Sequence, residues 1–211
     1  MEQRQIRILV VDDHPLLRAG LGTSIGAEPD MHIVAAAANG REGLELFRQH
    51  QPDVTLMDLK MPVMGGVEAI QAIRGQFPAA KVIVLSTYEG DEDIYRALEA
   101  GATTYLLKNT LAEALVGVIR EVFAGGRPLP AAIAQRLADR ILQPELTPRE
   151  LDVLRLMVKG MRNKEIAAQL GICDETAQSH VKNILLKFGV HDRTEAVTVA
   201  VRRGIVHLDY D

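Results

Sequence analysis

The sequence predicts an α/β fold with a doubly wound, five-stranded parallel sheet, followed by a small all-α domain of four helices. The first 125 residues alternate mostly apolar runs with amphipathic stretches five times, which is the pattern of βα units. From Leu146 onward, the apolar residues recur at helical spacing. Charge also divides the chain: residues 1–126 hold 11 Lys and Arg against 17 Asp and Glu, a net of −6, whereas residues 147–204 hold 10 against 7, a net of +3. Such a split suggests two modules with different partners, and a nucleic acid suits the second.

The strands and helices of the first domain are expected in alternation. The apolar runs have the length and β-branched content of buried parallel strands. Gly101 is expected to close a helix, and Pro52 and Pro78 stand before strands. The expected strands are 6–11, 31–37, 53–57, 81–86 and 103–107, and the expected helices lie near 15–27, 40–50, 66–76, 91–100 and 110–124.

The C-terminal helices follow a break in this alternation. Gly125 and Gly126 end the βα pattern, and residues 126–145 are expected to be a linker with a short helix. Thr147 and Glu150 predict a capping box at the start of the next helix. A helix, a tight turn containing glycine and a second helix are typical of a helix-turn-helix. The four helices are expected between 147 and 160, at 164–170, from 174 to about 188, and at about 194–203.

Composition excludes several classes of protein. Apolar residues make up 47% of the chain and aromatic residues only 4%, so the cores must be aliphatic. No apolar stretch reaches the roughly 18 residues that cross a membrane, so no membrane partner is expected. The first residues form no apolar signal segment, and the single cysteine, Cys173, cannot form an internal disulfide. These features predict a cytoplasmic protein.

Three carboxylates are expected to meet at one edge of the sheet. The run 8–11 ends in Asp12 and Asp13, and the run 54–57 ends in Asp58. Ligands bind at the carboxyl ends of parallel strands. Like charges there repel one another unless a cation joins them, and oxygen ligands favour Mg²⁺. A carboxylate beside Mg²⁺ can accept a phosphoryl group.

The motifs LVVDDHPLLRAGL, VTLMDLKMPVMGG, VIVLST and YLLK resemble, in this order, the receiver domain of response regulators. The resemblance covers residues 5–125, and we take 1–125 as a flavodoxin-like receiver domain. It implies that Asp58 accepts a phosphoryl group from a sensor histidine kinase or a small phosphodonor. It further implies that Asp12, Asp13 and Asp58, with the backbone carbonyl of Lys60, hold Mg²⁺.

The same resemblance implies how such a receiver would switch. Lys108 would pair with Asp58 and then with a phosphoryl oxygen. Ser86 would move its hydroxyl toward the phosphoryl group, and Tyr105 would rotate inward as that hydroxyl moves. Phosphatases with an aspartyl nucleophile share this topology, but they carry a second Asp where Lys60 stands. Only self-phosphorylation and slow autodephosphorylation are therefore expected, and no enzyme activity on other substrates.

Residues 146–206 resemble the LuxR/FixJ-type helix-turn-helix, and we take 146–211 as the DNA-binding domain. With the receiver, the chain resembles a full-length NarL/FixJ-family response regulator. The resemblance implies binding to a double-stranded DNA operator, with the third helix in the major groove. Gln178, which stands where many relatives have a basic residue, is expected to lower the salt dependence of binding. Base contacts are expected from Gln178, Ser179 and Lys182, phosphate contacts from Thr176, Asn163 and Lys164, and a packed or phosphate-facing position from His180.

The last helix is implied to form a homodimer on activation. Ala196, Val197, Ala200 and Val201 would carry this contact, although each suits the core of its own domain equally well. The expected function is a phosphorylation-controlled transcription regulator. One alternative is a regulator whose receiver no longer reacts and is controlled by a partner or ligand. The other alternative is an aspartyl phosphatase.

Overall fold

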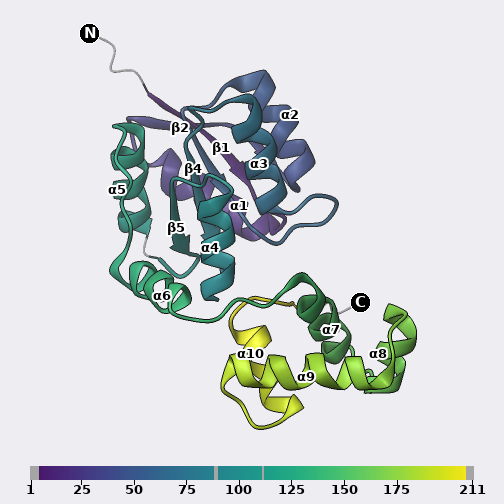
Figure 1. Ribbon diagram of the computed structural model, residues 1–211. Coiled ribbons are helices and arrows are strands. Elements are labelled where there is room, and N and C mark those ends of the chain that lie inside the picture. Colours follow the sequence, from purple (N-terminus) through teal and green to yellow (C-terminus); the bar gives the residue numbers. More distant parts are fainter. Residues whose placement is uncertain (1–4, 88–89, 111, 208–211) are drawn as a thin grey trace. The chain divides into compact units, whose positions relative to one another are not determined.

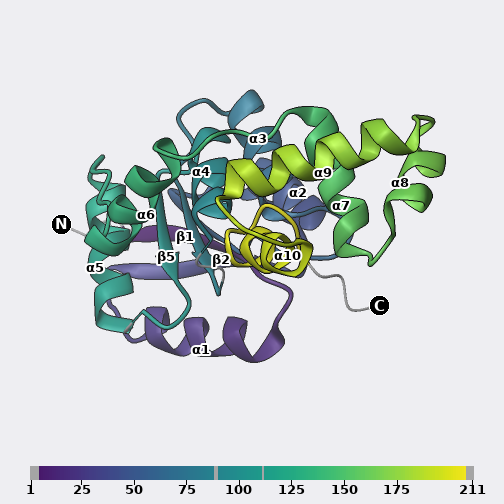
Figure 2. The same ribbon diagram turned by 60° about the horizontal axis from the view of Figure 1, so that its bottom comes forward.

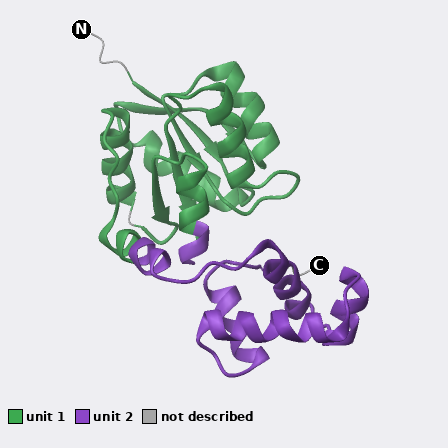
Figure 3. Cartoon of the chain, viewed as in Figure 1, with its two compact units in different colours: residues 1–88, 94–135 green, residues 89–93, 136–211 purple. Residues whose placement is uncertain are grey.

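A computed structural model describes residues 5–87, 90–110 and 112–207 (Figure 1). The outermost residues of both expected domains, 1–4 and 208–211, lie outside this described part. The chain divides into two compact units, one of residues 1–88 and 94–135 and a second of residues 89–93 and 136–211 (Figure 3). The division at 135/136 falls inside the expected linker, within helix α6 (Ala131–Ile141).

The first unit contains the predicted parallel sheet. All paired strands run parallel, in the order β2-β1-β3-β4-β5. Each strand begins within one residue of its expected start. Beside the start of β3, the Asp53 carboxylate accepts a hydrogen bond from the Arg7 N–H at 3.0 Å. The strands are β1 (Ile6–Val11), β2 (Met31–Ala37), β3 (Val54–Met57), β4 (Val82–Ser86) and β5 (Thr104–Leu107).

Helices cover both faces of this sheet (Figures 1 and 2). On one face, Leu21 and Ile25 of α1 and Ile119 of α5 pack with strand residues such as Ile8 and Ile83. The remaining helices, α2, α3 and α4, cover the other face. The helices are α1 (Pro15–Gly26), α2 (Gly40–His50), α3 (Gly66–Gln76), α4 (Asp91–Glu99) and α5 (Ala112–Phe123).

The second unit contains the four predicted helices around an aliphatic core. They are α7 (Pro148–Val158), α8 (Asn163–Leu170), α9 (Asp174–Phe188) and α10 (Arg193–Arg202). The predicted capping box at Thr147 and Glu150 is confirmed. Helix α9 packs against each of the other three helices, so its position depends on all of them. None of the helices in the described residues is long and apolar enough to cross a membrane.

Candidate functional site

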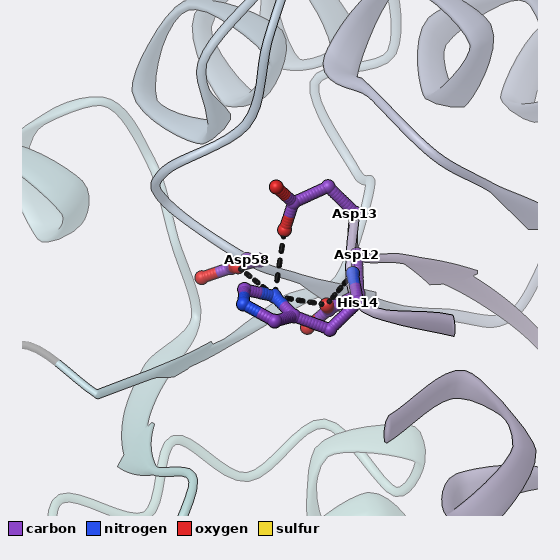
Figure 4. A group of neighbouring side chains, drawn as sticks. All are labelled: Asp12, Asp13, His14 and Asp58. Atoms are coloured by element: carbon purple, nitrogen blue, oxygen red, sulfur yellow. Dashed lines mark hydrogen bonds and ion pairs between the residues drawn. The ribbon is translucent and has the colours of Figure 1, made fainter. Parts of the chain in front are cut away.

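The three predicted carboxylates lie together at the carboxyl ends of β1 and β3 (Figure 4). Asp12 is 2% exposed and Asp58 is 3% exposed, whereas Asp13 is partly exposed. The main chain fixes Asp58, whose N–H donates to the Val11 carbonyl at 2.8 Å. We call Asp12, Asp13 and Asp58 the acidic cluster.

Lys108, which follows β5, bridges two members of the acidic cluster. Its Nζ lies 2.6 Å from Asp58 Oδ2 and 2.7 Å from Asp12 Oδ2. Burial disfavours the charged lysine, but the two carboxylates outweigh burial and raise the pKa of Lys108. Burial also raises the pKa of Asp58, although Lys108 and the Leu59 N–H act in the opposite direction.

The composition of this site fits a divalent cation. Within the acidic cluster and Lys108, three carboxylates face one ammonium, so two negative charges of the set remain. In the described part of the chain, Asp13 Oδ1 is buried and has no hydrogen-bond partner. Carboxylate oxygens at such spacing are the ligands that Mg²⁺ prefers.

The loop after β3 has little room beside Asp58. A Cβ on Gly66 would lie 2.0 Å from the Asp58 carbonyl oxygen, so only glycine fits where α3 begins. Val63 in the same loop has a φ of 68°, an uncommon conformation for a β-branched residue, and is 73% exposed. Backbone strain of this kind is frequent near functional sites.

A cavity of about 720 Å³ adjoins the acidic cluster. Asp58 and Lys108 line it together with the apolar side chains of Leu16, Leu17 and Met61. Leu16 is 88% exposed, so the rim beside Asp58 presents apolar surface to solvent. Asp58 is therefore almost buried and still lines a cavity large enough for a small donor group.

The two predicted switch residues lie in β4 and β5. Ser86 is fully buried at the end of β4, and its carbonyl accepts a hydrogen bond from the Lys108 N–H at 2.9 Å. This bond places Ser86 next to the residue that bridges the acidic cluster. Tyr105 is also fully buried and pairs with Val84 of β4.

His14 is a member of this site for which the sequence predicted no role. It follows Asp13 directly, and its Nδ1 lies 2.7 Å from Asp13 Oδ1 and 3.2 Å from Asp12 Oδ1 (Figure 4). Its position immediately after the Asp12-Asp13 pair was the signal in the sequence that could have identified it.

The predicted base-contacting residues lie on one exposed face of α9. Gln178, Ser179 and Lys182 are all exposed, whereas Ala177 and Ile184 on the opposite side are fully buried. Of the predicted phosphate contacts, Lys164 is exposed, and Asn163 and Thr176 are half-buried.

The remaining predicted contact residues are half-buried or buried. His180 is half-buried, and its Nδ1 is buried without a hydrogen-bond partner among the described residues. In α10, Ala196 and Ala200 are fully buried in the core of their own domain. Val197 and Val201 are partly buried against the same core. Of these four residues, only the two valines therefore have exposed surface that a second chain could contact.

Comparison with known proteins accounts for both units. Residues 8–120 match the response regulator receiver domain, and residues 144–200 match the LuxR family of bacterial regulatory proteins. The chain belongs to the response regulators that join a receiver domain to a LuxR-type helix-turn-helix, which are transcription regulators of two-component systems.

Individual relatives extend over almost the whole chain. The transcriptional regulatory protein LiaR of Bacillus subtilis is 38% identical, covering 96% of this chain and 100% of LiaR. The crystal structure of the response regulator ChrA of a heme-sensing two-component system is 33% identical, covering 96% of this chain and 99% of that one, with a TM-score of 0.59. A structure of RcsB dimers bound to DNA, 22% identical, covers 94% of this chain and 99% of that one with a TM-score of 0.70, and shares the fold.

Proposed function

We propose that phosphorylation of Asp58 controls binding of this chain to operator DNA in the cytoplasm. The observation that carries the proposal is a nearly buried Asp58 carboxylate that lines a cavity and is held by Lys108 at 2.6 Å. A phosphoryl group would leave a histidine nitrogen of a sensor kinase, or the acyl oxygen of a small phosphodonor. Its phosphorus would form a new bond to a carboxylate oxygen of Asp58.

The acidic cluster and the Lys60 carbonyl would hold Mg²⁺ beside Asp58. When bound, Mg²⁺ supplies positive charge that stabilises the phosphoryl oxygens during transfer. Lys108 supplies a second positive charge and orients the Asp58 carboxylate for attack.

Two buried groups would transmit the phosphorylated state. The Ser86 hydroxyl would bond a phosphoryl oxygen, and Tyr105 would repack beside it. The result is a shift in a pre-existing equilibrium toward the DNA-competent homodimer. On DNA, Gln178, Ser179 and Lys182 would reach base edges, while Thr176, Asn163, Lys164 and His180 would lie at the phosphates.

The test of phosphorylation uses acetyl phosphate and Mg²⁺ with the full chain. Intact-mass spectrometry is expected to show a gain of one phosphoryl group in the wild type and none in Asp58→Asn. Glu68→Gln, which removes an exposed carboxylate in α3 of the same domain, is the matched control and is expected to react normally. No mass gain in the wild type would favour a receiver that is controlled by a partner or ligand.

The test of DNA control selects bound sequences from a random DNA pool with and without the phosphodonor. Phosphorylated wild type is expected to enrich a two-fold symmetric site, and Asp58→Asn to enrich it weakly in both conditions. Equal enrichment by wild type and Asp58→Asn under all conditions would contradict phosphorylation control.

A further inference from the structure

The His14 imidazole lies among the carboxylates that are proposed to hold the metal (Figure 4). Its Nδ1 is 2.7 Å from Asp13 Oδ1, 3.2 Å from Asp12 Oδ1 and 4.0 Å from Asp58 Oδ2. All four side chains offer a ligand atom, and these atoms lie within 4.8 Å of one another. One imidazole nitrogen therefore lies among ligand atoms that are otherwise carboxylate oxygens.

Main-chain interactions fix the backbone of His14 beside the acidic cluster. Its N–H donates to Asp12 Oδ1 at 2.8 Å. Pro15 follows as the first residue of α1 and restricts the backbone of His14, which has extended dihedral angles. The His14 side chain is 67% exposed, so packing does not force its ring toward the acidic cluster.

The spacing of these atoms suits a shared metal ion. In an octahedral site with bonds of about 2.1 Å, neighbouring ligand atoms lie about 3 Å apart and opposite ones about 4 Å apart. The distances from His14 Nδ1 to the oxygens of Asp13, Asp12 and Asp58 fall within about this range, so the four side chains could hold one ion together. The 2.7 Å contact between Nδ1 and Asp13 Oδ1 lacks the geometry of a hydrogen bond. Nδ1 and Asp12 Oδ1 form a hydrogen bond at 3.2 Å, which a bound ion would replace.

We propose that His14 Nδ1 is a metal ligand and raises the preference of this site for transition ions over Mg²⁺. Imidazole nitrogen binds divalent transition ions well, whereas Mg²⁺ favours carboxylate, carbonyl and water oxygens. The inference rests on the proposed metal site beside Asp58 and names the ion selectivity of that site.

The experiment measures Mn²⁺ and Mg²⁺ binding to the full chain by titration calorimetry. Mn²⁺ is the probe because it accepts oxygen ligands as Mg²⁺ does and reports a bound nitrogen magnetically. His14→Ala is expected to weaken Mn²⁺ binding about tenfold and to change Mg²⁺ binding less than twofold. His191→Ala, which removes an exposed imidazole of the second unit, is the matched control and is expected to change neither affinity.

Pulsed electron paramagnetic resonance supplies a second readout that does not depend on affinity. Bound Mn²⁺ is expected to show coupling to an imidazole ¹⁴N in the wild type and to lose it in His14→Ala and His14→Gln. The inference is overturned if the coupling is absent in the wild type. It is also overturned if His14→Ala changes both affinities equally, or if it tightens Mg²⁺ binding, since the ring would then be a competitor of the ion.

The outcomes separate this inference from the proposed function. If both ions bind and Asp58 is phosphorylated, but His14 variants behave as the wild type, only the inference about His14 fails. If neither ion binds the wild type, the proposed metal site fails as well. Unfolding temperatures of the His14 variants confirm that any loss of binding is local.

Discussion

The two units use buried charge in opposite ways. In the first unit, Asp12 and Asp58 share a single lysine, Lys108, and the third carboxylate, Asp13, lies beside them. In the helix-turn-helix unit, Glu150 and Lys187 form a one-to-one pair at 2.6 Å between α7 and α9. Negative charge that neighbouring side chains do not balance indicates a site that can bind a cation and react. A balanced ion pair indicates a structural role.

Other charged residues of the helical unit also hold its helices together. Arg149 donates to the Leu170 carbonyl at the end of α8, at 2.7 Å, and Arg193 donates to the Met161 carbonyl before α8. These bonds tie the two ends of α8 to α7 and α10. Gln178, Ser179 and Lys182 take no part in them and are exposed on one face of α9. The groups proposed to read DNA are thus distinct from those that hold the domain together.

The largest expected effect comes from removing the lysine in each unit. Lys108→Met leaves two buried carboxylates beside each other, and the free energy of unfolding is expected to fall by about 3 kcal/mol in the presence of a chelator. Millimolar Mg²⁺ is expected to restore much of this loss, because a cation again joins the carboxylates.

Lys187→Met is the matched variant in the helical unit. It is expected to cost about 2 kcal/mol by urea denaturation, whether or not Mg²⁺ is present. Equal responses of the two variants to Mg²⁺ would contradict the distinction between a cation site and a structural ion pair.

The second effect concerns the pH dependence of the structural ion pair. Burial alone would raise the pKa of Glu150, but the bonds from Lys187 and Thr147 outweigh burial and lower it. A lowered pKa in the folded state contributes stability above the ordinary value of about 4.5, and this stability is lost as pH falls through the folded pKa.

Glu150→Gln is therefore expected to cost about 1–2 kcal/mol at pH 7 and progressively less as the pH falls from about 4.5 toward 3. Urea denaturation of wild type and variant across this range measures the difference, in which the titration of all other carboxyl groups cancels. A constant difference between pH 7 and pH 3 would show that the Glu150 charge does not stabilise the fold.

The sequence predicts most of the fold and of the acidic cluster, and the features that it does not predict have physical causes. The strands and their acidic ends are predictable because aliphatic runs and strand-end carboxylates are local signals. The position of the His14 ring cannot be predicted in this way, because it depends on the side-chain torsion angles. The sequence likewise shows that four residues of α10 are apolar: Ala196, Val197, Ala200 and Val201. Only the packed structure shows that the two alanines fill the core of their own domain.

The third effect concerns the exposed face of α9. Lys182→Ala is expected to weaken operator binding about tenfold and, if Lys182 contacts a phosphate, to reduce the slope of log affinity against log salt by about one. Fluorescence anisotropy at several salt concentrations measures both quantities. Lys159→Ala, an exposed lysine after α7, is the control, and an equal loss there would point to nonspecific charge.

The smallest expected effect concerns the cap of the proposed recognition helix. Helix α7 begins with a capping box, whereas Cys173 at the N-cap of α9 makes no side-chain capping bond. A serine hydroxyl at position 173 can accept a hydrogen bond from a free N–H of the first turn, so Cys173→Ser is expected to add about 0.5–1 kcal/mol to the free energy of unfolding. Cys173→Ala, which offers no acceptor, is the control and is expected to be no more stable than the wild type. If serine and alanine give the same urea midpoint, an N-cap acceptor contributes nothing to α9, and its start is set entirely by packing against the neighbouring helices.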